Sequence, residues 1–149
     1  MTQVDSKVDR QTTGIIDIIP SEIEDFEQEV KRFQAGEWDE TDFQAFRLRQ
    51  GVYGQRQPDV HMVRIKFPFG GMTSAQVDML GEIVEKYTPL NKGHVTTREN
   101  IQLHHVPLLE AAEVLKMLAE VGLTTREACG NTVRNITGRA KAENGRAHV

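Results

Sequence analysis

A short stretch near the middle of the chain, GHVTTRENIQLHHV at residues 93–106, constrains the possible folds more than any other. Polar and apolar side chains alternate with a period of two around the turn at Glu99-Asn100, which predicts two paired strands, 95–98 and 101–106. The alternation divides the second strand into two faces, with Gln102, His104 and Val106 on one and Ile101, Leu103 and His105 on the other. One face can be buried, and the other, beside Arg98, can hold a ligand; a solvated outer sheet face is the alternative.

A second strand with the same period is predicted at His61–Phe67. Its odd-numbered positions 63, 65 and 67 are apolar, whereas Arg64 and Lys66 share the opposite face. Two like charges on one strand face repel each other unless water or an anion surrounds them. This strand therefore has either a wet outer face or an anion-binding one.

The order of the remaining elements predicts the fold class. Two helices are expected from apolar residues at helical spacing, at 74–87 (Val77, Leu80, Val84 and Tyr87) and at 109–121 (Ala111, Ala112, Leu115 and Leu118). A last β-prone run, NTVRNIT, covers residues 131–137. Together these elements predict an α+β, ferredoxin-like split β-α-β-β-α-β arrangement, in which both helices cover one sheet face and leave the other open.

The N-terminal third is expected to form an extension of this unit. Ile15–Ile19 could make one short edge strand, and the capping-box pair Ser21 and Glu24 predicts a helix that ends near Gln34. Thr41 and Gln44 repeat the capping pattern before a shorter helix, whose aromatic residues Trp38, Phe43 and Phe46 are expected in the core. The predicted organisation is a flexible segment 1–20, a helical extension 21–50, the half-domain 51–138 and a divergent tail 139–149.

Composition limits the classes of function. The net charge of −4 and the isoelectric point near 5.7 argue against a general nucleic-acid binder. The single cysteine, Cys129, excludes an internal disulfide framework, and alone it cannot hold a structural zinc or a four-thiolate iron–sulfur cluster. The first residues carry no apolar signal segment, and no run is long enough to span a bilayer, so we expect a cytoplasmic protein.

The predicted topology makes the first and third strands neighbours, which concentrates positive charge on the open face. That face would carry Arg64, Lys66, Gln102 and His104, with Arg98 and Arg134 at its borders. Because the planar guanidinium fork suits carboxylates and oxyanions, the pattern favours an anionic ligand. RNA is the rival ligand, but RNA-recognition modules of this topology stack bases on aromatic residues of the two central strands, and these positions are not aromatic here.

Four motifs in order resemble a known family: GVYGQRQ at 51–57, MVRIKFPFGGMT at 62–73, HVTTRENIQLHHV at 94–106 and ACGNTVRNITG at 128–138. They are similar to the N-terminal ferredoxin-like half-domain of sirohaem-dependent nitrite and sulfite reductases, and the similarity runs from about Ser21 to Gly138. The resemblance implies sirohaem and a [4Fe–4S] cluster as cofactors, a ferredoxin-like electron donor, and six-electron reduction of nitrite or sulfite.

The resemblance also implies roles for individual residues. Arg64, Lys66 and Arg134 would act on the oxyanion, and Arg98, Gln102, Arg134 and Asn135 would bind the sirohaem. No metal ligand is expected in this chain, because the cluster cysteines of the family lie in other domains. After Gly138 the sequence departs from the family pattern, so we expect a fragment that works with the remaining domains of the reductase or with a companion chain. Two alternatives stay open: a half-domain that binds a tetrapyrrole or an anion without redox activity of its own, and a structural interaction protein.

Overall fold

The computed structural model describes residues 19–137, and within them an α+β fold with one four-stranded sheet. The α+β class is therefore confirmed. The elements along the chain are α1 (Ile19–Gln34), α2 (Glu40–Arg49), β1 (Val52–Gly54), β2 (Val60–Ile65), a short 3₁₀ helix (Pro68–Gly70), α3 (Ser74–Tyr87), β3 (Gly93–Val95), β4 (Ile101–Pro107) and α4 (Leu108–Glu120).

The strands lie in the order β1-β2-β4-β3, and every neighbouring pair is antiparallel. The strands β2 and β4 are the central pair, as expected. The predicted last strand at 131–137 is wrong, because β1 occupies the edge beside β2 and residues 131–137 form no regular element. The two apolar side chains of that run, Val133 and Ile136, are 77% and 65% exposed, so no burial stabilises a strand there. Only a bridge between Lys66 and Thr124 extends this edge.

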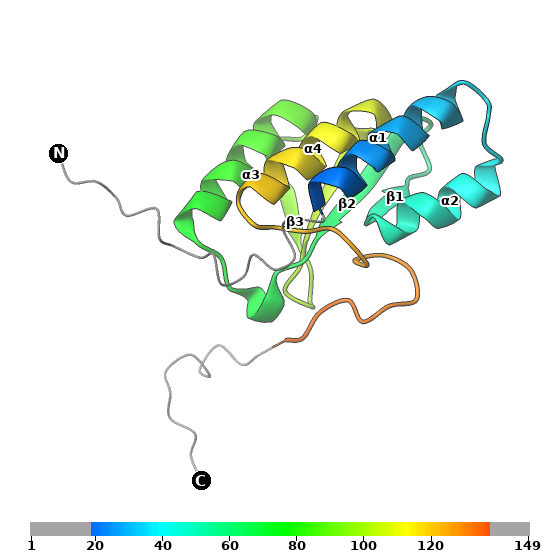
Figure 1. Cartoon of the computed structure of the whole chain (residues 1–149). Coiled ribbons are helices and arrows are strands. Elements are labelled where there is room, and N and C mark those ends of the chain that lie inside the picture. The colour runs from blue at the N-terminus through cyan, green and yellow to red at the C-terminus, as the bar shows by residue number, and fades with distance from the viewer. Residues whose placement is uncertain (1–18, 138–149) are drawn as a thin grey trace, which may run out of the picture.

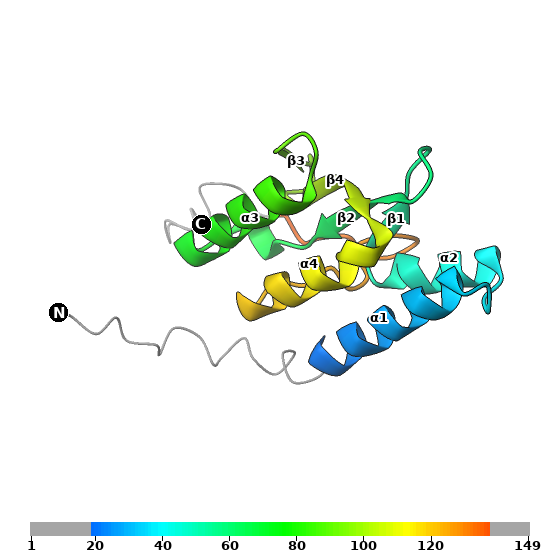
Figure 2. The same ribbon diagram turned by 90° about the horizontal axis from the view of Figure 1, so that it is seen from above.

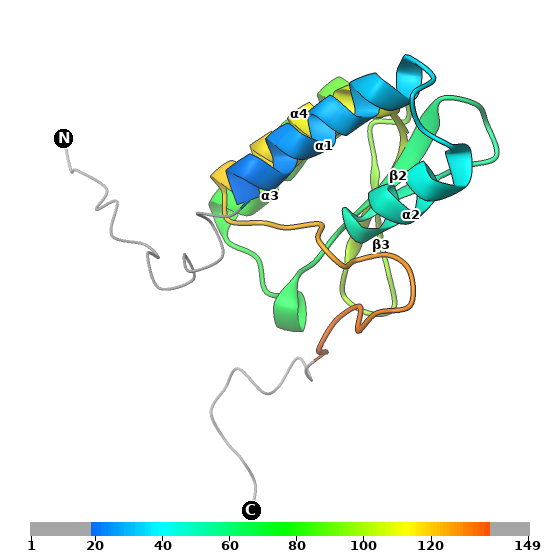
Figure 3. The same cartoon turned by 45° about the vertical axis from the view of Figure 1, so that its right-hand side comes forward.

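Three helices form a layer over one face of the sheet (Figures 1 and 2). In that layer α4 lies between α1 and α3. The helix α2 lies outside the layer, beside β1 (Figure 2), and Figure 3 shows it below the end of α1 from which the chain leads into it. The core lies under the layer and is built from α1, α3, α4 and the inward residues of the central strands, among them Phe26, Ile83, Leu118, Ile65 and Leu103. The opposite face of the sheet carries no helix of this layer.

The helix α3 spans residues 74–87, as predicted, and begins with a capping box between Thr73 and Gln76. The apolar stripe predicted for this helix is wrong at one position. Val77, which was expected in the stripe, is 51% exposed, whereas Ile83, which was not, is fully buried. The helix α4 begins and ends one residue earlier than predicted, and its four expected core residues, Ala111, Ala112, Leu115 and Leu118, are all buried.

A β-bulge corrects the two faces predicted for β4. The pairing register shifts between His61 and Val63, and His105 adopts a left-handed backbone conformation with φ 62°. Val106 is therefore fully buried with Leu103 in the core, instead of sharing the open face with Gln102. Gln55 supports the bulge, since its side-chain oxygen accepts a hydrogen bond of 2.6 Å from the backbone N–H of His105.

The strand predicted at 95–98 is also shifted, because β3 ends at Val95 and residues 96–99 form a turn. Thr96 favours the turn, since its hydroxyl accepts hydrogen bonds from the backbone N–H groups of Arg98 (3.3 Å) and Asn100 (3.2 Å). Glu99 has φ 61°, which ends the extended conformation.

In the helical extension, the helix α1 begins at Ile19, two residues before the predicted cap at Ser21. Residues 19 and 20 of the segment 1–20, which was expected to be flexible, belong to this helix. The rest of that segment, with the rest of the expected strand 15–19, and the tail 139–149 lie outside the described residues. The cap of α2 is Asp39 rather than Thr41, because the Asp39 carboxylate accepts from the Thr41 N–H. The aromatic residues pack as expected: Phe33 and Phe43 stack with ring centroids 4.0 Å apart, beside Trp38 and Phe46. Among residues 19–137, no helix is both long and apolar enough to cross a membrane.

Candidate functional site

Arg64 and Gln102 lie directly opposite each other on the two central strands and point away from the helical layer. When the Gln102 amide is oriented with its oxygen toward Arg64, that oxygen accepts a hydrogen bond from Arg64 Nε at 3.0 Å and a second one from Nη2. Arg64 Nη1 also lies 3.5 Å from the backbone oxygen of Ala128. These contacts fix the guanidinium group of Arg64 at the centre of the open face.

The segment after α4, orange in Figure 1, carries further cations to the same end of the sheet. It crosses the end of β2, where the N–H of Lys66 donates to Thr124 O at 3.0 Å and Lys66 Nζ donates to Val133 O at 3.3 Å. Arg134 follows directly, with its Nη2 group 3.3 Å from Gly130 O. A segment without regular secondary structure thus positions one of the predicted site residues.

Arg98 joins this group from the turn between β3 and β4. Its backbone oxygen accepts a hydrogen bond of 2.8 Å from the side chain of Asn135. Burial, opposed by the Cys129 thiol but reinforced by the nearby charges of Arg134 and Arg98, lowers the pKa of Arg64 from its usual value. The structure therefore brings together all six predicted site residues: Arg64, Lys66, Arg98, Gln102, Arg134 and Asn135.

The positive charges of this cluster lack carboxylate partners. Within residues 19–137, the ion pairs join Lys31, Arg32, Lys116 and Arg126 to glutamates of the helical part of the molecule. In the same described range, the four cations of the site make no ion pair; they are Arg64, Lys66, Arg98 and Arg134. We call these four residues the cation cluster. In a chain of net charge −4, it is a local concentration of positive charge that can bind an anion.

The similarity to known proteins agrees with this geometry. Residues 53–121 match the family described as nitrite/sulfite reductase ferredoxin-like half domain. The chain contains a nitrite/sulfite reductase ferredoxin-like half-domain. Arg64, Lys66, Arg98 and Gln102 lie within the matched residues of the half-domain, whereas Arg134 and Asn135 follow them.

Several ferredoxin–nitrite reductases are similar to the chain. The protein of Leptolyngbya laminosa is 35% identical over 122 residues, which are 80% of this chain and 23% of that protein. The chloroplastic protein of Arabidopsis thaliana is 40% identical over 93 residues, which are 62% of this chain and 15% of that protein. The solved structure of the Mycobacterium tuberculosis NirA protein superimposes with a TM-score of 0.62 and 25% identity, covering 68% of this chain and 21% of that one. The chain thus spans less than a quarter of the length of each of these relatives.

Beside the cation cluster, the half-domain has a hollow lined by histidines. The sequence predicted only some of the residues at this hollow. His104 was expected on the open face, but His94, which pairs with Gln102 in the sheet, and Gln55 were missed. The rings of His94 and His104 lie 5.9 Å apart, at a hollow of about 390 Å³ that His105 also lines. Burial, followed by the charges of His94, His105 and Arg64, lowers the pKa of His104. Pairing β3 with β4 across their turn would have located His94.

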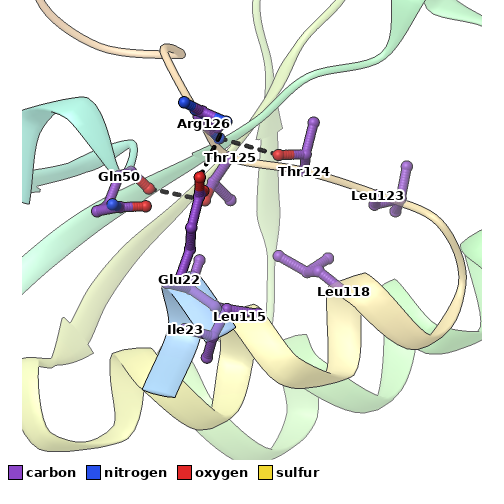
Figure 4. Close-up of a pocket in the computed structure, with 9 residues that line it drawn as sticks. All are labelled: Glu22, Ile23, Gln50, Leu115, Leu118, Leu123, Thr124, Thr125 and Arg126. Carbon is purple, nitrogen blue, oxygen red and sulfur yellow. Dashed lines mark hydrogen bonds and ion pairs between the residues drawn. The ribbon is translucent and has the colours of Figure 1, made fainter. Parts of the chain in front are cut away.

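A second, much smaller cavity lies on the side of the half-domain where α1, α4 and the segment after α4 meet, and it contains none of the predicted site residues (Figure 4). The ion pair between Glu22 and Arg126 (3.0 Å) and the hydrogen bond from the Thr125 hydroxyl to Gln50 O (2.7 Å) lie at this cavity. With a volume of about 20 Å³ it is a packing gap rather than a ligand site. Its contacts hold residues 124–127 against the extension.

Cys129 is buried between residues 124–127 and the cation cluster. Burial raises the pKa of its thiol, although Arg64, Arg134 and Arg47 act in the opposite direction. Among residues 19–137, no three His, Cys, Asp or Glu side chains gather as metal ligands.

Proposed function

We propose that this half-domain supplies the cationic side of the sirohaem and oxyanion pocket in a ferredoxin-dependent nitrite or sulfite reductase. The observation that carries the proposal is the cation cluster, whose four charges gather at one end of the open sheet face without a carboxylate partner in the described part of the chain. The similarity to ferredoxin–nitrite reductases supports nitrite as one substrate.

The residues fit a tetrapyrrole that has carboxylates around its rim. The Arg98 side chain is exposed and makes no hydrogen bond or ion pair within residues 19–137, so its whole fork is available to a carboxylate. Arg134 uses one nitrogen on Gly130 O and keeps its other donors. Arg98, Gln102, Arg134 and Asn135 are assigned to the sirohaem side of the pocket. Gln102 acts through Arg64, whose orientation it fixes.

Arg64, Lys66 and Arg134 are assigned to the oxyanion. When bound, sirohaem and its coupled [4Fe–4S] cluster supply the iron centre and the electrons for reduction. The guanidinium groups of Arg64 and Arg134 would stabilise negative charge on the substrate. Lys66 Nζ carries three N–H donors, of which one is directed to Val133 O, so it can hold a proton beside the substrate.

The cysteine count makes the remaining domains of the reductase, or a companion chain, part of the proposal. A four-thiolate cluster needs more than Cys129, which is the one cysteine of the sequence and is buried. We therefore assign residues 51–138 to the half-domain and place the cluster ligands outside this sequence. The electron donor in this proposal is a ferredoxin-like protein.

Binding of a polycarboxylate porphyrin tests the proposal on the 149-residue chain. Uroporphyrin is titrated into the wild type, Arg98→Met, Arg134→Met and the control Arg56→Met, with fluorescence as the readout. Arg56 is exposed, makes no ion pair within residues 19–137 and lies in the β1–β2 loop, at the opposite end of β2 from Lys66. We expect each of the first two variants to bind about threefold more weakly, as the loss of an exposed ion pair predicts, and the control to match the wild type.

Salt is the second arm of this experiment. Because the contacts are exposed ion pairs, affinity should fall steadily as the salt concentration rises. Equal affinity of all four proteins, or binding that is indifferent to salt, would contradict the assignment of the cation cluster to the tetrapyrrole carboxylates.

A further inference from the structure

The backbone of Phe67, directly after β2, is held on both sides by side-chain amides. Its N–H donates to Asn100 Oδ1 at 3.2 Å, and its carbonyl oxygen accepts from Asn135 Nδ2 at 2.8 Å. Phe67 itself is fully buried in the core, which anchors this backbone position to the helical layer. Two asparagines from distant parts of the sequence therefore bind the two peptide units that flank one buried residue.

The side chain of each asparagine also donates a hydrogen bond to the backbone oxygen of an arginine in the cation cluster. Asn100 Nδ2 donates to Arg134 O at 3.0 Å, and Asn135 Nδ2 donates to Arg98 O at 2.8 Å. The connections cross, because Asn100 follows the turn of Arg98 but holds Arg134, whereas Asn135 follows Arg134 but holds Arg98. We call this arrangement of Asn100, Asn135 and Phe67 the asparagine brace.

The bonding capacity of the two amides argues against direct ligand binding by either. Both N–H groups of Asn135 are engaged, and its oxygen accepts from the N–H of Ile136 at 2.9 Å. Asn100 is 1% exposed, so its side chain cannot reach a ligand on the sheet surface. The assignment of Asn135 to cofactor contact is thereby refined to an indirect role.

Electrostatics supplies the reason for such a brace. The charges of Arg98 and Arg134 lie near enough to Arg64 to lower its pKa, and within residues 19–137 no carboxylate pairs with any of the three. Their mutual repulsion therefore acts to separate the three segments that carry them. Arg98 is in a turn and Arg134 is in an irregular segment, so regular secondary structure does not oppose that separation.

We infer that Asn100 and Asn135 are positioning residues, which hold the backbones of Arg98 and Arg134 at a fixed spacing from Arg64 and so preorganise the pocket for the carboxylates of a tetrapyrrole. This inference rests on the proposed function for the identity of the ligand. The brace itself is a property of the chain without a ligand. A neutral amide is required at both positions, because each side chain donates to a backbone carbonyl and accepts from a backbone N–H.

The test compares Asn135→Ala and Asn100→Ala with Asn131→Ala in the 149-residue chain. Asn131 is an exposed asparagine of the same segment that makes no hydrogen bond within residues 19–137. All the variants keep the net charge, so any loss of affinity reports geometry rather than charge. Because Asn100 is buried and its variant can fail to fold, the half-buried Asn135 carries the test alone if necessary.

Amide hydrogen exchange is the first readout, since it needs no ligand. In Asn135→Ala we expect faster exchange at the N–H of Ile136, which bonds to Asn135, and at the N–H of Phe69, which donates to Ile136 O. The amides of α4 should keep their protection, as should every amide in Asn131→Ala. Unchanged exchange at both positions would overturn the brace.

Uroporphyrin binding is the second readout. We expect Asn135→Ala to bind uroporphyrin about threefold more weakly than the wild type, because the strength of an exposed arginine–carboxylate pair depends on its geometry. Asn131→Ala should bind as tightly as the wild type. Wild-type affinity in Asn135→Ala, together with lost protection at residues 69 and 136, would refute the positioning role. If the wild type itself does not bind uroporphyrin, the proposed function fails, and hydrogen exchange alone then supports or overturns the brace.

Discussion

His61 is a buried histidine whose titration should dominate the loss of stability in mild acid. It lies in β2 between Gly54 of β1 and Val106 of β4 and is 8% exposed, and its Nδ1 atom has no hydrogen-bond partner among the residues that the structure describes. Burial, followed by the positive charge of Arg47, lowers its pKa from 6.5 to about 4. The opposing charge of Asp59 is too weak to compensate.

The sign and size of the effect follow from linkage. Above pH 6.5 the imidazole is neutral in both the folded and the unfolded chain, so pH has no effect on stability through this group. Between pH 6.5 and about 4 the unfolded chain takes up a proton that the folded chain refuses, and stability falls as the pH falls. At about 1.4 kcal/mol per pKa unit, the free energy of unfolding should drop by about 3 kcal/mol across this window.

Urea unfolding of the 149-residue chain between pH 7.5 and 4, followed by circular dichroism, measures this loss. His61→Gln removes the titrating group, so its free energy of unfolding should depend on pH less steeply than that of the wild type, whatever its stability at neutral pH. His94→Gln, at an exposed histidine of the edge strand, should retain the wild-type dependence. Parallel curves for the wild type and His61→Gln would refute the reasoning, since the acid sensitivity would then come from other groups.

Three further predictions concern packing, close backbone contact and activity. Gly51 has φ 77° and its Cβ would overlap the Thr125 carbonyl oxygen, so Gly51→Ala should lower the free energy of unfolding by at least about 1–3 kcal/mol in the same urea assay. Leu115→Ala should cost about 2–5 kcal/mol, whereas Val77→Ala should be nearly silent because Val77 is half exposed; equal costs would contradict the helix orientations. The purified chain, reconstituted anaerobically with sirohaem, iron and sulfide, should not reduce nitrite or sulfite, because Cys129 is its one cysteine; sustained turnover with a co-eluting cluster would falsify the fragment interpretation.

The predictions from sequence were most accurate where the apolar residues recur with a regular period and are also the buried ones. The alternation around Arg64 and the resulting neighbourhood with Gln102 were predictable, because each odd-numbered position of β2 from 63 onward is apolar and buried. The helix α3 was predictable from its spacing and its capping box. The alternation and the helix depend on short-range chemistry that a single segment contains, and the pairing of Arg64 with Gln102 follows from the order of the elements.

The failures arose where tertiary contacts override a local pattern. The strand β1 has three residues, too few to show a period, and its place at the sheet edge depends on Val52 burying against β2. The bulge depends on the left-handed backbone conformation of His105, which nothing in the run IQLHHV predicts. The asparagine brace was missed for a similar reason, since its bonds join residues 33 to 68 positions apart.

The placement of β1 at the sheet edge also bears on how the chain assembles. Because β1 precedes β2 and fills the position that a strand after α4 would otherwise take, every strand and helix found within residues 19–137 lies between Ile19 and Glu120. The sheet and its helical layer are therefore complete without the segment that carries Arg134. Arg64 and Arg98 belong to the sheet and its turn, so Arg134 is the charge that the last segment adds to a fold that does not need it.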